Sequence, residues 1–163
     1  MIEETLVLIK PDGVERGLIG EIISRFEKKG LKIKGIKMVR VNRDLAMQHY
    51  TEDITRRRGE HVRKKLMDFI VNSHVVAICL QGVDAVENVR KIAGDTEPKS
   101  ALLGTIRGDY AHISYKYADE KNMAIPNLVH ASGNKEEAEK EIGLWFSQKE
   151  LFDYENVYDK HMR

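Results

Sequence analysis

The stretch that decides the fold is a short apolar run near the start of the chain, Thr5-Leu6-Val7-Leu8-Ile9-Lys10, followed directly by Pro11-Asp12-Gly13. A short run of consecutive apolar residues is typical of a buried strand. Proline, aspartate and glycine in succession have the composition of a turn. We therefore expect a buried strand that enters a loop with a functional role.

An amphipathic helix is predicted just after this loop. Ile19, Ile22, Ile23 and Phe26 recur at helical spacing, polar residues occupy the other side, and Gly30 supplies a C-terminal stop. The apolar side indicates that this helix lies on another layer of the protein.

The next strand is predicted over residues 31–38. Leu31 and Ile33 alternate with lysines, but the alternation slips at Gly35, after which Ile36 and Met38 take the apolar positions. An extra residue in one strand shifts the alternation by one position, so a bulge at Gly35 accounts for both halves.

The remaining elements follow from the same two periodicities. In chain order we expect a helix over residues 43–50, a polar and basic stretch, a helix marked by Val62, Leu66, Phe69 and Ile70, a strand buried on both faces over 75–80, a weaker helix over 84–91, a loop over 94–108, a strand over 111–115, and a last helix with Asn134 as N-cap and Glu137 three residues later. This order contains β-α-β-β-α-β. The fold class is therefore α+β, ferredoxin-like βαββαβ, with a four-stranded antiparallel sheet, helices on one face and additional helices, in a single domain over residues 1–163.

The composition favours a compact enzyme or binding domain. Among 163 residues, 42% are hydrophobic and 33% are charged, and 27 basic residues against 26 acidic ones give a net charge of +1. This balance disfavours a nucleic-acid partner, which normally requires a broad basic face, so any anion site must be local. The longest clean apolar run, residues 75–80, is far too short to span a membrane. With an acidic N-terminus and Cys79 as the only cysteine, we expect a cytoplasmic protein.

One histidine stands out as a centre for chemistry. Common phosphate-loop, dinucleotide and zinc motifs are absent from the sequence. His130 lies among small and polar residues over 127–134, just before the last helix, where backbone N–H groups and the helix dipole favour phosphate. The other histidines are expected to be structural or at the surface: His49, His61, His74, His112 and His161.

Several cationic residues lie at the ends of predicted elements. Lys10 ends the first strand, Arg90 precedes a turn that ends at Thr96, and Arg107 is flanked by small residues over 104–109. Each alone is compatible with a solvated side chain. Their combination favours a local anion site.

Together these motifs resemble the nucleoside diphosphate kinase family over residues 4 to 154. The residues that carry the resemblance are Ile9-Lys10-Pro11-Asp12-Gly13-Val14, Arg16-Gly17-Leu18-Ile19-Gly20-Glu21-Ile22, Gly104-Thr105-Ile106-Arg107-Gly108-Asp109, Asn127-Leu128-Val129-His130-Ala131-Ser132 and Ala138-Glu139-Lys140-Glu141-Ile142-Gly143-Leu144-Trp145-Phe146. The resemblance implies that His130 accepts the γ-phosphate of a nucleoside triphosphate, mainly ATP, and passes it to a nucleoside diphosphate by a ping-pong mechanism.

The resemblance also assigns roles to individual residues. It implies phosphate contacts by Lys10, Arg90, Thr96 and Arg107, with Mg²⁺ carried by the nucleotide phosphates and no metal site made of protein ligands alone. Glu141 matches the residue that holds the far nitrogen of the histidine ring, and Ser132 joins that network. Tyr50 lies near the transferring phosphate, while Asn127 and Lys10 contact the 3′-hydroxyl of the sugar. A homo-oligomer, hexamer or tetramer, is also implied.

Two segments depart from the family pattern. Residues 51–65 are longer than usual and lack the aromatic residue that stacks on the base. Counting back from Val75 places Val62 at that position, with His61 or an arginine guanidinium as alternatives. Residues 114–126 form a longer connection, expected to be a surface loop or hairpin at the mouth of the site. Gly133 and Ala131 are smaller departures.

Two other functions stay open at this point. A non-catalytic nucleotide- or RNA-binding module would use residues 56–65 as its contact surface, and protein histidine phosphorylation would be an added role. The joint presence of Lys10, Arg90, Arg107, His130 and Glu141 favours catalysis, because a pure binder does not require the nucleophile.

Overall fold

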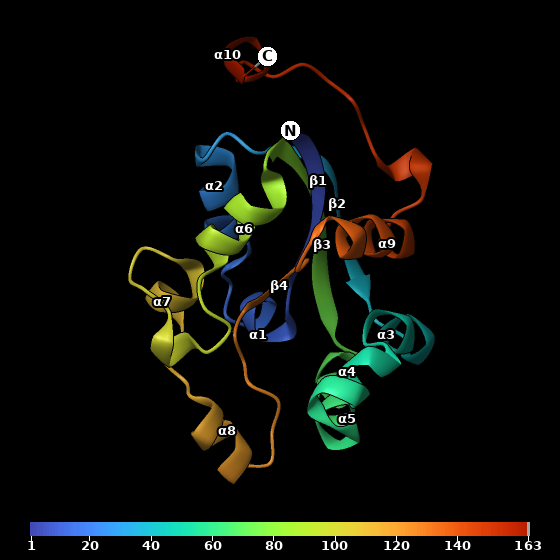
Figure 1. Ribbon diagram of the computed structural model, residues 1–163, viewed down its shortest axis with the longest axis vertical. Coiled ribbons are helices and arrows are strands. Elements are labelled where there is room, and N and C mark those ends of the chain that lie inside the picture. The colour runs from blue at the N-terminus through green and yellow to red at the C-terminus, as the bar shows by residue number, and fades with distance from the viewer. Residues whose placement is uncertain (163) are drawn as a thin grey trace.

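The computed structural model describes residues 1–162, and a four-stranded antiparallel sheet of order β2-β3-β1-β4 lies at its centre (Figure 1). The strands are β1 (Ile2–Ile9), β2 (Lys32–Arg40), β3 (His74–Val83) and β4 (Val129–Ala131). The helices are α1 (Pro11–Glu15), α2 (Ile19–Lys28), α3 (Arg43–His49), α4 (Glu52–Arg58), α5 (Glu60–Ile70), α6 (Ala85–Ala93), α7 (Ile106–Tyr110), α8 (Tyr115–Glu120), α9 (Lys135–Trp145) and α10 (Asp159–Met162), with single 3₁₀ turns η1 (Pro98–Ser100) and η2 (Gln148–Glu150). The predicted βαββαβ order is confirmed as β1-α2-β2-β3-α6-β4.

Helices cover both faces of the sheet rather than the single face expected. Along β1, Val7 and Ile9 pack with α2 and α6, whereas Leu6 and Leu8 pack with α3, α5 and α9. Successive side chains of a strand point to opposite faces, so the odd-numbered and the even-numbered side chains of β1 are buried on opposite faces of the sheet. This explains why the run over residues 6–9 is continuously apolar.

The predicted bulge in β2 is confirmed. The register of β2 against β3 shifts between Ile33 and Gly35. A Cβ atom on Gly35 would lie 2.7 Å from the carbonyl oxygen of Glu150 and 3.0 Å from Leu151, so the close passage of the C-terminal segment requires glycine there.

The strand expected over residues 111–115 is wrong, and the fourth strand is β4. Residues 111–114 have no regular structure, and α8 begins at Tyr115, with the Ser114 side chain accepting the Tyr117 N–H as its N-cap. The three residues of β4 are too few for alternation to be seen in the sequence. They form a strand because they pair with β1.

Three short helices, α1, α4 and α7, and the 3₁₀ turn η1 also differ from the sequence expectation. The Pro-Asp-Gly stretch is the start of α1, whose first position suits proline because it needs no N–H donor there. The basic stretch before α5 contains α4, and the region expected as a loop over 94–108 contains η1 and the start of α7. Each has at most seven residues, too short for a clear periodic stripe.

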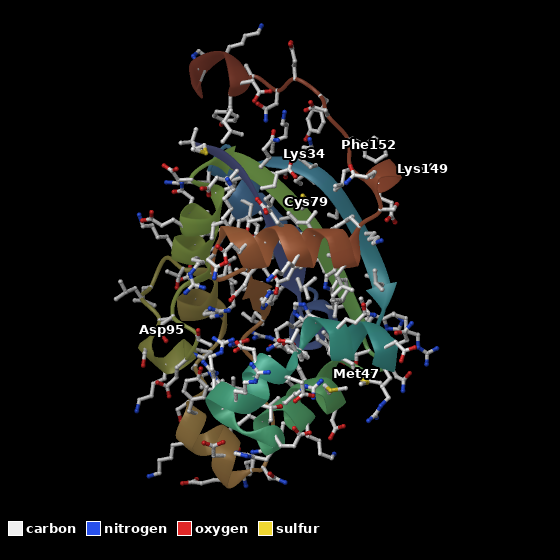
Figure 2. All side chains as sticks on the ribbon, turned by 45° about the vertical axis from the view of Figure 1, so that its right-hand side comes forward. Lys34, Met47, Cys79, Asp95, Lys149 and Phe152 are labelled. Atoms are coloured by element: carbon white, nitrogen blue, oxygen red, sulfur yellow. The ribbon has the colours of Figure 1, made fainter. Side chains whose placement is uncertain are left out.

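The C-terminal segment lies at the end of the sheet opposite α4, α5 and α8 (Figure 1). The Phe152 N–H donates to the Lys34 carbonyl at 2.7 Å, and Figure 2 shows Lys34, Lys149 and Phe152 grouped there, away from Met47 and Asp95. Cys79 is buried in the sheet, and burial raises the pKa of its thiol to about 12. Among the described residues, every helix is too short or too polar to cross a lipid bilayer.

Candidate active site

His130 lies on the edge strand β4, opposite Leu8 of β1. Its side chain is 25% exposed, so one side of the ring is open while the other is packed. The Nε2 atom lies 2.9 Å from Oε1 of Glu141, which projects from α9. The predicted pairing of these two residues is therefore present in the structure.

Glu141 joins His130 to Ser132. The Ser132 hydroxyl donates to Oε2 of Glu141 at 2.6 Å and is itself completely buried against β1, where its oxygen accepts the Leu6 N–H at 3.3 Å. Burial would raise the pKa of Glu141, but the hydrogen bond and charge of His130, with help from His49 and Ser132, hold that pKa below its ordinary value. The carboxylate is thus ionised at neutral pH and accepts the His130 Nε2–H.

A second histidine, His49, belongs to this cluster, a contact that the sequence pattern does not indicate. Its ring packs edge-on against His130, with the ring centroids 4.6 Å apart, and its Nδ1 accepts the Trp145 indole N–H at 3.3 Å. Burial lowers the pKa of His49 to about 3, so the ring is neutral. The sequence signal that could have identified His49 is its position immediately before Tyr50.

Tyr50 caps the C-terminus of α3 and packs beside His49, with ring centroids 4.8 Å apart. The residue is buried, and burial raises the pKa of its phenol above the ordinary value, with the negative charges of Glu141 and Asp12 adding to the effect. Tyr50 therefore remains a neutral hydrogen-bond donor close to the histidine pair.

Lys10 lies at the other side of the site, directly after β1. Its Nζ donates to Oδ1 of Asn127 at 2.8 Å and to the Ile125 carbonyl at 3.4 Å, and it lies 5.1 Å from the centre of the Phe69 ring. The pKa of Lys10 is lowered to about 8, mainly by burial, with an opposing effect of the Asp12 charge and a smaller lowering effect of Arg107.

Arg107 is fixed by three backbone carbonyls. Its Nη1 donates to Gly94 at 2.8 Å, its Nε to Asn127 at 3.1 Å and its Nη2 to Val129 at 2.7 Å. Burial lowers the pKa of the guanidinium to about 10, so it remains charged at neutral pH. Because a guanidinium has five N–H donors, two are left for a ligand.

The cations of the site form no direct ion pairs with acidic groups of the described residues. Within residues 1–162, no carboxylate oxygen lies within 4.0 Å of the charged nitrogens of Lys10, Arg90 or Arg107. Arg90, exposed near the end of α6, is close enough for its charge to lower the pKa of Arg107. Lys10 and Arg107 are buried without an ion pair, an arrangement that favours an anionic ligand.

Thr96 and Asn127 are linked to each other. The Asn127 side chain donates from Nδ2 to the Thr96 carbonyl at 2.8 Å while its Oδ1 accepts from Lys10. Thr96 itself is exposed, which leaves its hydroxyl accessible. The structure thus brings the loop after α6, the segment before β4 and the end of β1 together.

Val62 is the predicted residue least tied to the others. It lies half-buried on α5, in line with Leu66 and Phe69 at helical spacing, and Phe69 contacts Lys10. This stripe borders the Lys10 side of the site. His61 is exposed on the same helix.

The connection expected as a surface loop or hairpin contains the helix α8. It faces α5 across the entrance, where Nζ of Lys65 lies 3.7 Å from Oδ1 of Asp119. Figure 1 shows α8 and α5 at the same end of the molecule. An exposed ion pair of this length contributes little to stability.

The acidic and imidazole groups of the site do not suit Mg²⁺. Among the described residues, His49, His130 and Glu141 are the one set whose donor atoms, all within 4.8 Å of each other, could hold a metal. Two of the three are nitrogen ligands, whereas Mg²⁺ prefers oxygen, and the donor atoms already hydrogen-bond one another or Trp145.

The sequence model of the family described as "Nucleoside diphosphate kinase" matches residues 3–151. The chain belongs to the nucleoside diphosphate kinase family. Among its relatives, the nucleoside diphosphate kinase of Pyrococcus horikoshii is 53% identical over 157 residues, covering 96% of this chain and 93% of the relative. That of Borreliella burgdorferi is 47% identical over 155 residues, covering 94% and 93%.

Solved nucleoside diphosphate kinases share the whole fold. The transition-state mimic of the Borrelia burgdorferi enzyme with bound vanadate and ADP superposes with a TM-score of 0.97 at 45% identity, covering 99% of this chain and 96% of that one. The halophilic enzyme of Halobacterium salinarum in complex with CDP gives 0.82 at 36% identity, covering 100% and 99%. The fold is therefore shared over nearly the full length of the chain.

Proposed function

We propose that His130 is the phosphate acceptor in a nucleoside diphosphate kinase reaction, in which the γ-phosphate of a nucleoside triphosphate, mainly ATP, passes through a phosphohistidine to a nucleoside diphosphate. The observation that carries this proposal is the hydrogen bond from His130 Nε2 to Glu141. Because an ionised carboxylate can only accept, the proton of the neutral ring resides on Nε2. The lone pair is then on Nδ1.

In the first half-reaction the Nδ1 lone pair attacks the γ-phosphorus in line with the bridging oxygen. The N–P bond forms as the bond from that oxygen to phosphorus breaks, and the nucleoside diphosphate leaves with the electron pair. The proton stays on Nε2 of His130, the ionised Glu141 accepts its hydrogen bond and stabilises the positive charge of the ring, and Ser132 fixes the carboxylate. In the second half-reaction a terminal phosphate oxygen of another nucleoside diphosphate attacks the phosphorus. The N–P bond breaks, its electron pair returns to Nδ1, and a nucleoside triphosphate leaves.

The cations that form no direct ion pair support the proposal that the site contacts the phosphates of the nucleotide. Lys10, Arg90 and Arg107 would stabilise the negative charge on the phosphate oxygens, and the Thr96 hydroxyl would donate to them. Asn127, held by Lys10, would contact the 3′-hydroxyl of the sugar. Mg²⁺ would enter bound to the nucleotide phosphates and would offset their charge, consistent with the nitrogen-rich donor set of the protein.

Tyr50 and Val62 would complete the nucleotide contacts. The neutral phenol of Tyr50 can donate to the transferring phosphate. Val62 lies on the stripe of α5 that borders Lys10, which supports apolar contact with the base. A valine offers no aromatic surface, so this contact would discriminate weakly between bases.

Radioactive labelling tests the proposal. Incubation with γ-labelled ATP should give an acid-labile, base-stable label that passes to GDP or CDP, and His130→Ala should remove it. An unlabelled parent protein, or full activity of His130→Ala, would reject the proposal. The alternative of a non-catalytic nucleotide- or RNA-binding module is not favoured, since the relatives are named as kinases and one structure mimics a transition state.

We further propose a homo-oligomer, hexamer or tetramer, in the cytoplasm. The edge strand β2 supports self-association, because its outer side is unpaired by another strand of the described chain and exposes Ile36 by 48% and Met38 by 57%. Analytical ultracentrifugation would measure the number of subunits, and a monomer at micromolar concentration would contradict the oligomer.

A further inference from the structure

A strained turn precedes the nucleophile. Leu128 has a φ of +71°, and the Val129 N–H donates to the Asn127 carbonyl at 2.8 Å, which closes a three-residue γ-turn around Leu128. This form of γ-turn is rare and strained, and the left-handed region is unfavourable for a residue with a branched side chain. Such a conformation persists only where its surroundings fix it.

Four donors fix the carbonyls of this turn. The Lys10 N–H donates to the Leu128 carbonyl at 2.8 Å. Arg107 donates to the Asn127 carbonyl at 3.1 Å and to the Val129 carbonyl at 2.7 Å, and the turn's own hydrogen bond supplies the fourth. The N–H of Leu128, the central residue of the turn, also needs an acceptor.

Asp12 supplies that acceptor from α1. Its Oδ2 accepts the Leu128 N–H at 2.9 Å, across 116 residues of sequence. The approach of α1 to the turn is close, since a Cβ on Gly13 would lie 3.1 Å from the Leu128 carbonyl oxygen and 2.8 Å from Cγ2 of Ile9. The other oxygen, Oδ1, is buried and has no hydrogen-bond partner among the described residues.

We infer that Asp12 is a positioning residue for His130, an inference that rests on the proposed function. By holding the Leu128 N–H, Asp12 keeps the turn in its strained form, and the turn sets the direction in which the chain enters β4. Because β4 has only three residues paired with β1, it cannot fix His130 alone. Without Asp12 the turn relaxes, and the histidine moves relative to the phosphate contacts.

Asp12 has a competing role that must be separated from this one. Its charge raises the pKa of both Lys10 and Arg107, so it is also a counter-charge in the site. Asp12→Asn removes the charge but keeps an oxygen that can accept the Leu128 N–H. Asp12→Ala removes both. We call the hydrogen bond from the Leu128 N–H to Asp12 the clamp. The clamp and the counter-charge predict different results for Asp12→Asn.

Single-turnover phosphorylation of His130 by γ-labelled ATP, with the KM for ATP measured alongside, tests the inference. A displacement of about 1 Å lowers a rate by about 10²-fold. We expect Asp12→Ala to slow phosphorylation by that order with KM changed less than about threefold, and Asp12→Asn to restore the rate to within about tenfold of the parent. Glu150→Ala is the matched control: its carboxylate accepts the Ser147 N–H at 2.8 Å, far from the site, and its loss should leave the rate unchanged.

Equal slowing by Asp12→Asn and Asp12→Ala would overturn the clamp in favour of the counter-charge, and a parental rate in Asp12→Ala would overturn it outright. If Asp12→Ala does not fold, Asp12→Ser replaces it, because the serine side chain is too short for its hydroxyl oxygen to reach the Leu128 N–H. Asp12→Ser should then phosphorylate His130 more slowly than Asp12→Asn by the same factor. A parental rate in Asp12→Ser would overturn the clamp. A parent protein that takes up no label defeats the proposed function instead, so the two failures are distinguishable.

Discussion

Replacing Lys10 by methionine is expected to stabilise the ligand-free protein while abolishing phosphate binding. Burial lowers the pKa of Lys10 from 10.5 to about 8, because the charged form loses its hydration without gaining a carboxylate partner. This difference corresponds to about 3 kcal/mol that opposes folding at neutral pH. Methionine has a similar length and no charge.

The gain is reduced by the hydrogen bonds that methionine cannot make. Asn127 Oδ1 and the Ile125 carbonyl each lose a donor, at a cost of about 1 kcal/mol per group. A net stabilisation of about 1 kcal/mol remains, which corresponds to about 2–4 °C in the melting temperature of a chain of this size. Denaturant and thermal unfolding at one fixed protein concentration would measure it.

The effect also has a defined dependence on pH. The folded pKa of Lys10 lies below its unfolded value, so between about pH 8 and 10.5 the unfolded chain binds more protons than the folded one. The stability of the parent contributed by this group therefore rises across that window, and the advantage of Lys10→Met shrinks. An advantage that grows with pH would contradict the reasoning.

Lys32 provides the matched control. It is as buried as Lys10, each being 4% exposed, but its Nζ lies 3.4 Å from Asp153 and 3.3 Å from Asp159. Removing one partner of a buried ion pair is destabilising. Lys32→Met should thus lower stability, and a Lys10→Met protein that is equally destabilised would refute the account.

Three other substitutions test the site. Glu141→Gln should lower the single-turnover phosphorylation rate by about 10²-fold with little change in KM, because a neutral amide stabilises the charged ring poorly. His49→Phe should slow phosphorylation about tenfold without changing its pH profile between pH 5 and 9, since the His49 pKa is about 3, and it should alter the fluorescence of Trp145, the only tryptophan. Arg107→Lys should raise the KM for ATP about 10- to 100-fold, because an ammonium cannot reproduce three carbonyl contacts and still contact phosphate. Parental kinetics in any of these would contradict the assigned role.

The sequence predicted those elements whose periodicity is long enough to be read. The strand after Thr5, the helix after Ile19 and the bulge at Gly35 were all predicted, because each depends on side chains that neighbour one another along the chain. The strand β4 was missed, and a strand was placed at residues 111–115 instead, because three residues carry no measurable alternation. Pairing with β1 makes them a strand, and that contact spans more than 100 residues.

Site residues in contiguous motifs could be predicted from the sequence, whereas contacts between distant parts of the chain could not. His130, Glu141 and the cations were predicted because they lie in contiguous motifs with a recognisable resemblance. From the sequence His49 is expected only to be structural or at the surface, because its partners Trp145 and Glu141 reach it only when α3 and α9 pack on one face of the sheet. A sequence shows residue types and spacing, but not which histidine a distant indole will contact.

Near-neutral composition and a cationic site are compatible because, among the described residues, Lys10, Arg90 and Arg107 lie together and form no direct ion pairs. Lys10 and Arg107 are both buried, and each also fixes the turn at Leu128, one through its backbone N–H and the other through its guanidinium. The two residues proposed to bind phosphate thus also supply donors to the turn that precedes His130. In Arg107 both functions belong to one guanidinium, whereas the backbone N–H of Lys10 is kept in Lys10→Met and an acceptor oxygen is kept in Asp12→Asn. Substitutions of Asp12 and Arg107, which fix the same turn, should therefore be non-additive when combined.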